Sequence, residues 1–268
     1  MRQQSSLARL LASAAVTTIL AAGLGGCQTV SDITGSLTSK PDTGSEAGLR
    51  HSVDVAGERY HANPKDAEAA VAYGQALRAA GQRSQAAAVL EQASIAHPGN
   101  KALLAAFGRA LADNGNFQAA FDVLTRAHTP DNPDWRILSV QGTVLDQLGR
   151  HDEARDYYAS ALRIVPDEPS VLSNLGLSYV LSRDLPKAEE TLRKAYASGR
   201  ADARVRQNLG LVVGLQGRFA EAESIVKADL PPDQAAANVA YLKQMLSRKD
   251  NPRSGSGKVP MASLNAPD

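Results

Sequence analysis

The sequence is poor in cysteine, in aromatic residues and in any surplus of charge. Its single cysteine, Cys27, excludes an intrachain disulfide. Aromatic residues make up only 4% of the chain, whereas hydrophobic residues, mostly Ala and Leu, reach 43%. That composition favours closely packed helices, so we expect an all-α protein. The net charge is +1 and basic residues are not clustered, which gives no reason to expect nucleic acid as a partner.

The N-terminal residues 1–26 have the pattern of a secretory signal peptide. Two arginines precede an apolar run over residues 11–22, which is too short to remain as a transmembrane span. The following residues 24–27, Leu-Gly-Gly-Cys, resemble the lipobox of bacterial lipoproteins, in which the cysteine becomes the acylated first residue of the mature protein. The alternative is a soluble secreted protein that is cleaved near Ala22 and keeps Cys27 as a free thiol.

The resemblance to the lipobox implies that Cys27 is the lipidation site. Each buried methylene of an acyl chain contributes about 0.8 kcal/mol, so several chains would hold the protein on a membrane almost permanently. Gln28 follows the cysteine, at a position where Asp signals inner-membrane retention in many Gram-negative bacteria. The resemblance therefore implies a lipid anchor on the periplasmic face of the outer membrane. Residues 27–48 are polar and are expected to contain the lipidated cysteine and a flexible tether.

A repeat of 34 residues is the strongest pattern in the sequence. A glycine recurs five times with this period, an alanine follows each glycine by twelve residues, and a large residue follows it by sixteen. The glycines are Gly74, Gly108, Gly142, Gly176 and Gly210, the alanines are Ala86, Ala120, Ala154, Ala188 and Ala222, and the large residues are Leu90, Leu124, Tyr158, Leu192 and Val226. A second glycine follows the first by seven residues in four repeats, and Arg183 takes its place in the fourth.

These residue types indicate a helical hairpin in each repeat. Helices whose axes approach to about 8–10 Å need small residues where they cross, and the first glycine and the alanine provide them. The second glycine suits the end of the first helix, where a left-handed backbone is favourable. Each hairpin has an apolar seam that it cannot bury alone, so we expect the hairpins to stack.

The period and the positions of small and large residues resemble those of the tetratricopeptide repeat. The resemblance covers residues 67–236 and implies a solenoid of five repeats, over residues 67–100, 101–134, 135–168, 169–202 and 203–236. We expect residues 49–66 to form a helix that caps the first repeat. Residues 237–248 carry an amphipathic pattern and are expected to cap the last repeat. Residues 249–268 are rich in Pro, Ser and Gly and are expected to be a disordered tail.

In tetratricopeptide folds the first helix of each repeat lines a concave face, and the resemblance therefore implies which residues are exposed to a protein partner. In the first three repeats these residues are mostly polar and include Asp146. In the last two repeats they include Ser173 and several apolar residues. The expected partner-binding residues are Arg109, Arg136, Asn174, Leu177, Val180, Leu181, Asn208, Leu211 and Leu215.

Two alternatives remain open for this face. Asn174 and Asn208 stand where related repeats hold the backbone of a bound peptide, or else they stabilise the array itself. The apolar residues either contact a partner, as exposed apolar patches commonly do, or are covered by the C-terminal helix that contains Val239 and Leu246.

Patterns that would indicate catalysis or metal binding are missing from the sequence. The histidines lack the spacing of a zinc site, and His151 is expected to face solvent at the start of a helix. Residues 254–258, Ser-Gly-Ser-Gly-Lys, lack the first glycine of a phosphate-binding loop. No Gly-x-Ser-x-Gly motif of a hydrolase is present. We therefore expect a protein that is not an enzyme and that takes no cofactor, metal or small-molecule substrate.

A lipobox, a polar tether and about five tetratricopeptide repeats together resemble the TadD-type lipoproteins of tight-adherence (Flp) pilus systems. The Ala-rich first repeat, over residues 73–81, adds to this resemblance. It implies an assembly factor whose partners are a secretin or other pilus assembly components. The alternatives are an adaptor of the same fold for outer-membrane biogenesis or for a cell-wall enzyme and, from another class, an enzyme whose active site has no recognisable motif.

Overall fold

The computed structural model describes residues 45–250 of the 268-residue chain. Twelve α-helices account for most of these residues, and no β-strand occurs among them apart from an isolated bridge between Thr129 and Asn132. The expected all-α fold is thus confirmed. The helices belong to two compact units, of which the first ends at Ile164 and the second begins at Val165. The expected signal peptide, Cys27 and most of the expected tether lie outside the described residues.

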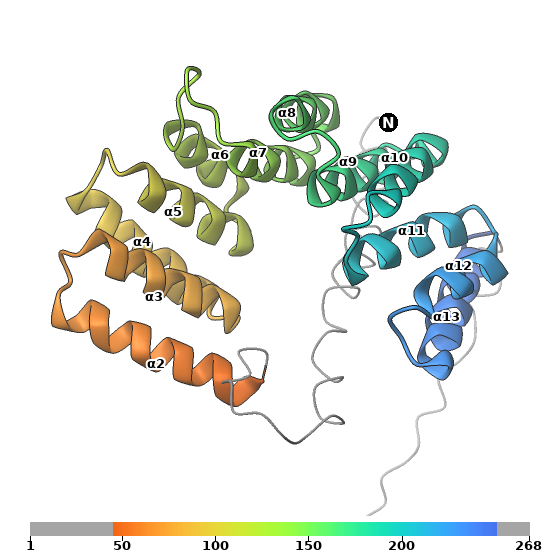
Figure 1. Cartoon of the computed structure of the whole chain (residues 1–268), viewed down its shortest axis with the longest axis horizontal. Helices are drawn as coiled ribbons and strands as arrows, with labels where there is room; N and C mark the ends of the chain where they lie inside the picture. Colours follow the sequence, from red (N-terminus) through yellow and green to blue (C-terminus); the bar gives the residue numbers. More distant parts are fainter. Residues whose placement is uncertain (1–44, 251–268) are drawn as a thin grey trace, which may run out of the picture. The chain divides into compact units, whose positions relative to one another are not determined.

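The first unit contains one helix and three helical hairpins. Helix α2 (Glu46–Ala62) is followed by α3 (Ala67–Ala79) with α4 (Arg83–Ala96), α5 (Lys101–Asp113) with α6 (Phe117–Arg126), and α7 (Trp135–Gln147) with α8 (His151–Ile164). Each helix packs against the next along the chain, and the first helices α3, α5 and α7 also pack in order against one another (Figure 1). One apolar core extends from Tyr60 to Val144 through this stack.

The second unit contains two hairpins and a terminal helix. Helix α9 (Pro169–Leu181) pairs with α10 (Leu185–Ala197), and α11 (Ala203–Leu215) pairs with α12 (Phe219–Val226). The last helix, α13 (Pro232–Asp250), packs against both α11 and α12. It thus takes the place that the first helix of another hairpin would take.

The small residues of the repeat lie where the helices cross. A Cβ atom added to Gly142 would lie 2.6 Å from the ring of Tyr158, which is much closer than carbon atoms pack. At each of the five repeat glycines the obstructing side chain is the one sixteen residues later, at 2.5 or 2.6 Å. The five repeat alanines are at most 1% exposed. The expected roles of these glycines and alanines are therefore confirmed.

Polar residues with the same period begin the first helices of all five hairpins. The side chain of each accepts a hydrogen bond from a backbone amide in the first turn, and these N-cap residues are Asp66, Asn100, Asp134, Glu168 and Asp202. A cap of this kind stabilises a helix by about 1 kcal/mol. The caps therefore fix where each hairpin begins. Their spacing of 34 residues is a second periodic pattern in the sequence, in addition to the pattern of small residues.

The second glycine of each repeat ends the first helix in a left-handed conformation. Its φ angle lies between 74° and 83° at Gly81, Gly115, Gly149 and Gly217. Arg183 has a φ of 63° at the equivalent place in the fourth hairpin. A side chain with a Cβ is disfavoured in this conformation, so the turn between α9 and α10 carries backbone strain that the other four turns lack.

Replacing Arg183 with Gly should raise the free energy of unfolding by about 1 kcal/mol, because glycine adopts a positive φ without a steric penalty. Urea unfolding of the full chain would measure the change. Arg183→Ala is the matched control, since it removes the guanidinium but keeps the Cβ, and it should give little gain. Equal gains from both variants would show that the backbone conformation is not the cause.

The ends of the array differ from the boundaries expected from the sequence. Helix α2 begins at Glu46, inside the segment expected to be a tether, and the Ser45 hydroxyl caps it by accepting from the Gly48 amide at 3.0 Å. Helix α13 begins at Pro232 instead of residue 237, because α12 ends early and proline suits the first turn of a helix. It continues to Asp250, two residues into the expected tail, and residues 251–268 lie outside the described part.

Helix α2 stands in the register of a second helix. Residues 49–62 precede α4 by the repeat length, and Pro64 likewise precedes Pro98. The helix packs on α3, where the ring of Tyr60 stacks on that of Tyr73 with 5.6 Å between centroids. Helix α2 is therefore half of a hairpin that caps the first complete one. None of the helices in residues 45–250 is long and apolar enough to cross a bilayer.

Candidate functional site

Three arginines gather on the first helices of the first unit. Arg78 lies on α3, Arg109 on α5 and Arg136 at the start of α7. Burial, followed by the positive charge of Arg78, lowers the pKa of Arg109 below its usual value, and Arg136 acts in the same direction. Asp134 and Asp113 oppose this shift only in part. Arg109 is thus a half-buried guanidinium with two other arginines and two aspartates close to it.

The three arginines differ in how far their charge is neutralised. Arg78 donates from Nε to Oδ2 of Asp113 at 2.6 Å. The guanidinium of Arg136 lies 4.6 Å from the centre of the Trp135 ring and is exposed. Among the residues with described side chains, neither Arg109 nor Arg136 forms an ion pair. A carboxylate of a partner would therefore find two cations here that form no ion pair within the described part of the fold.

A shallow hollow of about 170 Å³ lies between α3 and α5 in the first unit. It is lined by Glu68, Val71 and Gln75 on α3 and by Ala102 on α5, among others. Its volume is enough for one small side chain. This face therefore offers shape as well as charge to a partner.

In the second unit the expected binding residues form an apolar set on α9 and α11. All five are half-buried instead of fully exposed, and they are Leu177, Val180, Leu181, Leu211 and Leu215. Val180 also packs against the apolar core of this unit. The helices α9 and α11 pack against each other. The set thus lies on two adjacent first helices, with part of each side chain covered by the fold itself.

The two asparagines of this unit take part in contacts within the fold. Asn208 on α11 donates from Nδ2 to the hydroxyl of Ser173 on α9 at 2.8 Å. Ser173 is fully buried, so the expectation that it is exposed in a groove is wrong, because the neighbouring repeat covers it. Asn174 is half-buried and also interacts with neighbouring groups. The contact of Asn208 favours the alternative in which this asparagine holds adjacent repeats together.

Helix α13 packs as an end cap on the last hairpin. A Cβ atom added to Gly214 on α11 would lie 2.5 Å from Cδ2 of Leu242, so this glycine makes room for the helix. Val239 packs against the core of the unit, and Ala235 is fully buried. The apolar side of α13 is therefore partly buried where this helix packs against α11 and α12.

The expectation that Asp146 lines the groove is also wrong. Asp146 is 7% exposed and accepts a hydrogen bond from the hydroxyl of Tyr158 at 2.9 Å. Its other carboxylate oxygen lies 2.9 Å from Nδ1 of His151, which is half-buried and does not simply face solvent. Burial, followed by the charge of Asp146, raises the pKa of Tyr158 well above its usual range, so the phenol remains a donor. This polar cluster joins α7 to α8.

A second polar cluster joins α10 to the turn between α11 and α12. Glu189 accepts from Arg218, from Nε2 of Gln216 at 2.8 Å and from Nε of Arg193 at 2.8 Å. These hydrogen bonds, that of Arg218 above all, lower the pKa of Glu189 from 4.5 to about 2. The side chain is 15% exposed, so solvent screens these contacts only in part. The cluster therefore stabilises the ionised carboxylate in the folded state.

Replacing Glu189 with Gln should lower the free energy of unfolding by about 1–2 kcal/mol at pH 7. A carboxylate whose pKa is lowered by folding stabilises the fold above its unfolded pKa, and this contribution is lost as the pH falls from about 4.5 towards 2. The difference between the wild-type and variant proteins should therefore shrink over this range. Urea unfolding at pH 7, 4 and 3 would measure it, with the exposed neighbour Glu190→Gln as control. A difference that is the same at pH 3 and pH 7 would rule out the ionised contact as its cause.

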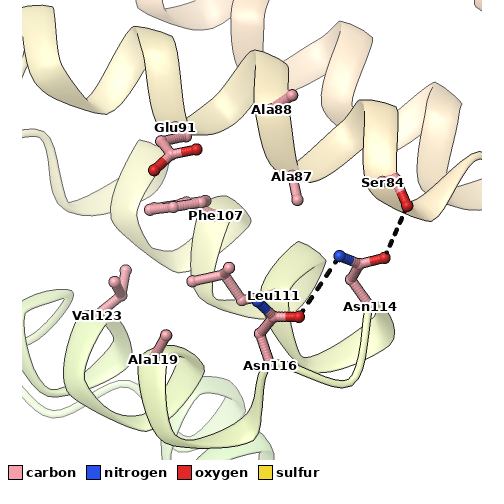
Figure 2. A pocket seen from close by; sticks show the side chains of 10 residues that line it. All are labelled: Ser84, Ala87, Ala88, Glu91, Phe107, Leu111, Asn114, Asn116, Ala119 and Val123. Carbon is pink, nitrogen blue, oxygen red and sulfur yellow. Dashed lines mark hydrogen bonds between the residues drawn. The ribbon is translucent and has the colours of Figure 1, made fainter.

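A larger hollow lies between the second helices α4 and α6 in the first unit, and its volume is about 450 Å³ (Figure 2). We call it the second-helix groove; its lining residues are Ser84, Ala87, Ala88, Glu91, Phe107, Leu111, Asn114, Asn116, Ala119 and Val123. This groove was not predicted from the sequence, because all the expected partner-binding residues lie on first helices. Ala87 could have indicated the groove, because the residue one repeat later is the much larger Phe121.

Metal binding finds no support in this part of the molecule. Within the described residues, no group of three His, Cys, Asp or Glu side chains is arranged to hold a metal ion.

Two models of the tetratricopeptide repeat match the chain, over residues 77–141 and 136–201. Among curated proteins, the chain is similar to uncharacterized protein y4yS of Sinorhizobium fredii, with 35% identity over 104 residues, 38% of this chain and 56% of that protein. It is also similar to BBSome complex member BBS4 of Bos taurus, with 24% identity over 148 residues, 55% of this chain and 28% of that protein. The chain thus spans about half the length of the first and about a quarter of the second.

Several solved structures share the fold. PilW, described as a widely conserved type IV pilus biogenesis factor, has a TM-score of 0.63 and 16% identity, over 72% of this chain and 91% of that one. A thermophilic tetratricopeptide-repeat protein of Thermus thermophilus has a TM-score of 0.59 and 21% identity, over 67% and 100% of the two chains. For the APC/C hetero-tetramer Cut9–Hcn1, the TM-score is 0.60 and the identity 19%, over 80% and 44%.

At these identities the solved structures are evidence for the fold alone. The family models, the 34-residue period and the packed hairpins agree with one another. Residues 77–201 therefore consist of tetratricopeptide repeats, and the described helices have the all-α fold of a tetratricopeptide-repeat solenoid.

Proposed function

We propose that this protein is a lipid-anchored scaffold that binds other proteins through the first helices of its hairpins and assists the assembly of a tight-adherence (Flp) pilus secretion system. The tetratricopeptide fold is typical of protein–protein interaction scaffolds. The observation that carries the proposal is the composition of the first-helix faces. In the first unit this face has two arginines, Arg109 and Arg136, that form no ion pair among the described side chains, and in the second unit it has a cluster of half-buried apolar residues.

Further observations support the proposed location at the outer membrane and the proposed role in pilus assembly. The lipobox that ends at Cys27 supports a lipid anchor, and Gln28 supports the periplasmic face of the outer membrane. The fold shared with a type IV pilus biogenesis factor is in keeping with a role in pilus assembly. On this proposal the partners are a secretin or other pilus assembly components. The protein is not an enzyme, and it takes no cofactor, no nucleic acid and no small-molecule substrate.

The chemistry of the two faces indicates what a partner should carry. An acidic side chain or a terminal carboxylate would interact with Arg109 and Arg136, and such charges raise the rate of association more than the affinity. An apolar segment would complete the burial of Leu177 and Leu211, which contributes mainly to affinity. A pilus component that binds through both faces should thus be acidic in one part and apolar in another.

The double variant Leu177→Asp with Leu211→Asp should reduce the capture of secretin and pilus components by at least about tenfold. The reason is that two charged groups would be buried against an apolar partner segment without compensation. Affinity purification of the full chain from membranes of cells that make the pilus would measure the loss. Ser224→Asp, on the exposed side of α12, is the matched control for added charge.

Because both leucines are half-buried, the double variant needs a test of folding. Its circular dichroism and its melting temperature should stay close to those of the Ser224→Asp control. Arg109→Glu in the first unit provides an independent variant, and it should slow the association of the same partners. Full capture by both folded variants would exclude the first-helix faces as the binding site. Capture of porin-assembly or peptidoglycan proteins in place of pilus components would assign the alternative, an adaptor of the same fold.

A further inference from the structure

The second-helix groove has an apolar floor and small residues on its walls. Phe107 and Leu111 of α5 form the floor, and each is 8% exposed (Figure 2). Ala87 and Ala88 of α4 line one side of it, and Ala119 and Val123 of α6 line the other (Figure 2). The groove therefore exists because the residues on α4 and α6 that would fill it are small.

The next hairpin of the first unit shows what fills the equivalent place. Phe121 on α6 stands one repeat after Ala87, and its ring meets that of Tyr157 on α8 edge-on, with 5.8 Å between the centroids. The guanidinium of Arg150 lies 5.5 Å from the centre of the same ring. Tyr157 and Arg150 are the repeat equivalents of Val123 and Asn116. The space between α6 and α8 is thus occupied by an aromatic ring with a cation over it, and the corresponding space between α4 and α6 is not.

We propose that the second-helix groove binds an aromatic side chain of a partner protein, carried next to a basic residue on an extended segment. The aromatic ring takes the place beside Ala87 that Phe121 takes in the next hairpin. A ring buries a large apolar area at a small cost in conformational entropy, and its edge and face both pack well on Phe107 and Leu111. This surface is distinct from the first-helix faces, so the proposal goes beyond the function proposed above and does not depend on it.

The rim of the groove indicates a cation beside the ring. Glu91 is exposed at one end and forms no ion pair among the residues with described side chains (Figure 2). Many other surface carboxylates, Glu153 and Glu221 for example, are paired with arginines. A Lys or Arg of the partner would neutralise Glu91.

The other end of the groove suits an extended backbone. The Ser84 hydroxyl donates to Oδ1 of Asn114 at 3.0 Å, and Nδ2 of Asn114 donates to Oδ1 of Asn116 at 3.5 Å (Figure 2). The Nδ2 group of Asn116 donates to no group in the described part of the fold, so it can donate to a carbonyl of the partner. Carbonyl groups are free in an extended segment and already bonded in a helix.

The sequence excludes one source of the aromatic ring. Residues 1–44 and 248–268 contain no Phe, Tyr or Trp, so the ends of this chain that lie outside the described side chains cannot supply it. The exposed tyrosines Tyr196 and Tyr241 lie on helices α10 and α13 and not on extended segments. A separate protein with an extended aromatic-basic segment fits better than a second copy of this chain.

Methyl NMR of the full chain with a capped tetrapeptide, glycine-phenylalanine-arginine-glycine, tests the proposal. The peptide should give saturable shifts at the methyl groups of Ala87, Leu111 and Val123. A matched peptide with alanine in place of phenylalanine should bind at least about tenfold more weakly, because it loses the burial of the ring. Equal binding of the two peptides, or no shift at these methyl groups with the phenylalanine peptide, would overturn the proposal.

Variants of the groove separate its parts. Ala87→Phe should fill the groove from within and abolish the shifts at Leu111 and Val123, and Ala88→Phe on the exposed side of α4 provides a second blocked variant if the first does not fold. Glu91→Lys should weaken the binding of the arginine peptide severalfold. It should not weaken the binding of the same peptide with glutamine in place of arginine. Undiminished binding to a folded blocked variant would show that the peptide binds elsewhere.

The next hairpin offers a gain-of-function test. Phe121→Ala should open an equivalent place between α6 and α8 and create a second site for the same peptide, seen as new shifts on α8. Failure of a second site to form in the folded variant would contradict the equivalence of the two places.

Light scattering of the wild-type protein tests whether the occupant of the groove is a separate partner or a second copy of this chain. A dimer that is lost in both Ala87→Phe and Tyr241→Ala would assign the groove to a second copy and overturn the proposal of a separate partner.

Discussion

Replacing Ala154 with Phe should lower the free energy of unfolding by about 1–3 kcal/mol or more. Ala154 is fully buried on α8, where this helix crosses α7 close to Gly142 and Tyr158. The crossing has no spare room, because even the Cβ of an alanine at Gly142 would lie 2.6 Å from the Tyr158 ring. A phenyl ring in place of a methyl group must therefore push the two helices apart.

The damage should extend beyond the third hairpin, because neighbouring hairpins share their interfaces. Urea unfolding would measure the loss of stability, and hydrogen exchange should show reduced protection in α6 and α7 as well as in α8. Ala159→Phe is the matched control, since this alanine lies exposed on the same helix. An Ala154→Phe protein that melts at the wild-type temperature would show that the assigned crossing position is wrong.

The proposed lipid anchor predicts that replacing Cys27 with Ser moves the protein almost completely from the outer membrane to the soluble periplasmic fraction. Acylation needs the cysteine sulfur, and a serine hydroxyl does not replace it in this processing. Loss of the acyl chains removes an anchor worth about 0.8 kcal/mol for every buried methylene. The helices described here include none that could span the bilayer in its place. Cell fractionation with immunoblotting would measure the redistribution.

Two controls separate the anchor from other effects. Processing of the wild-type precursor should stop in the presence of globomycin, which inhibits cleavage at the lipobox. Gln28→Asp keeps the cysteine and should leave the protein lipidated but retained in the inner membrane. If the Cys27→Ser protein fractionated with the outer membrane as the wild-type protein does, the lipid anchor would have to be abandoned.

Much of the fold could be predicted from the sequence, because the tetratricopeptide hairpin depends on a few close approaches. Gly142 must be small because Tyr158 lies against it, and the same pair recurs in every repeat with a fixed separation of sixteen residues. Such contacts are local, so they leave a periodic trace in the sequence. The N-caps, such as Asp134, leave a similar trace for the same reason.

The candidate site could be predicted less well, because the exposure of a residue on a first helix depends on the neighbouring helices as well as on its own position. Ser173 has the register of a groove residue but is buried under Asn208 of the next repeat. Asp146 has such a register too, yet Tyr158 and His151 cover it from its own hairpin. The identities of these covering side chains differ from repeat to repeat, so the period carries no information about them.

The end of the array departed from the prediction for a related reason. Helix α12 spans only Phe219–Val226, and α13 already begins at Pro232. The period predicts a full second helix followed by a later cap, but the proline at the first position of α13 shifts its start towards the N-terminus. A single residue with strong conformational preferences thus overrides the repeat at the C-terminal end of the described helices.

The half-hairpin at the other end has a mechanical consequence. Helix α2 buries only Gly57 and Tyr60, and it packs on α3 without a first helix of its own among the described residues. A pull on the N-terminal side of the chain would therefore peel α2 away before it opened any complete hairpin. The 17 residues of α2 would lengthen from about 25 Å as a helix to about 58 Å when extended. If the proposed lipid anchor holds the N-terminal side of the chain, α2 would thus unfold and refold reversibly under load before the complete hairpins do.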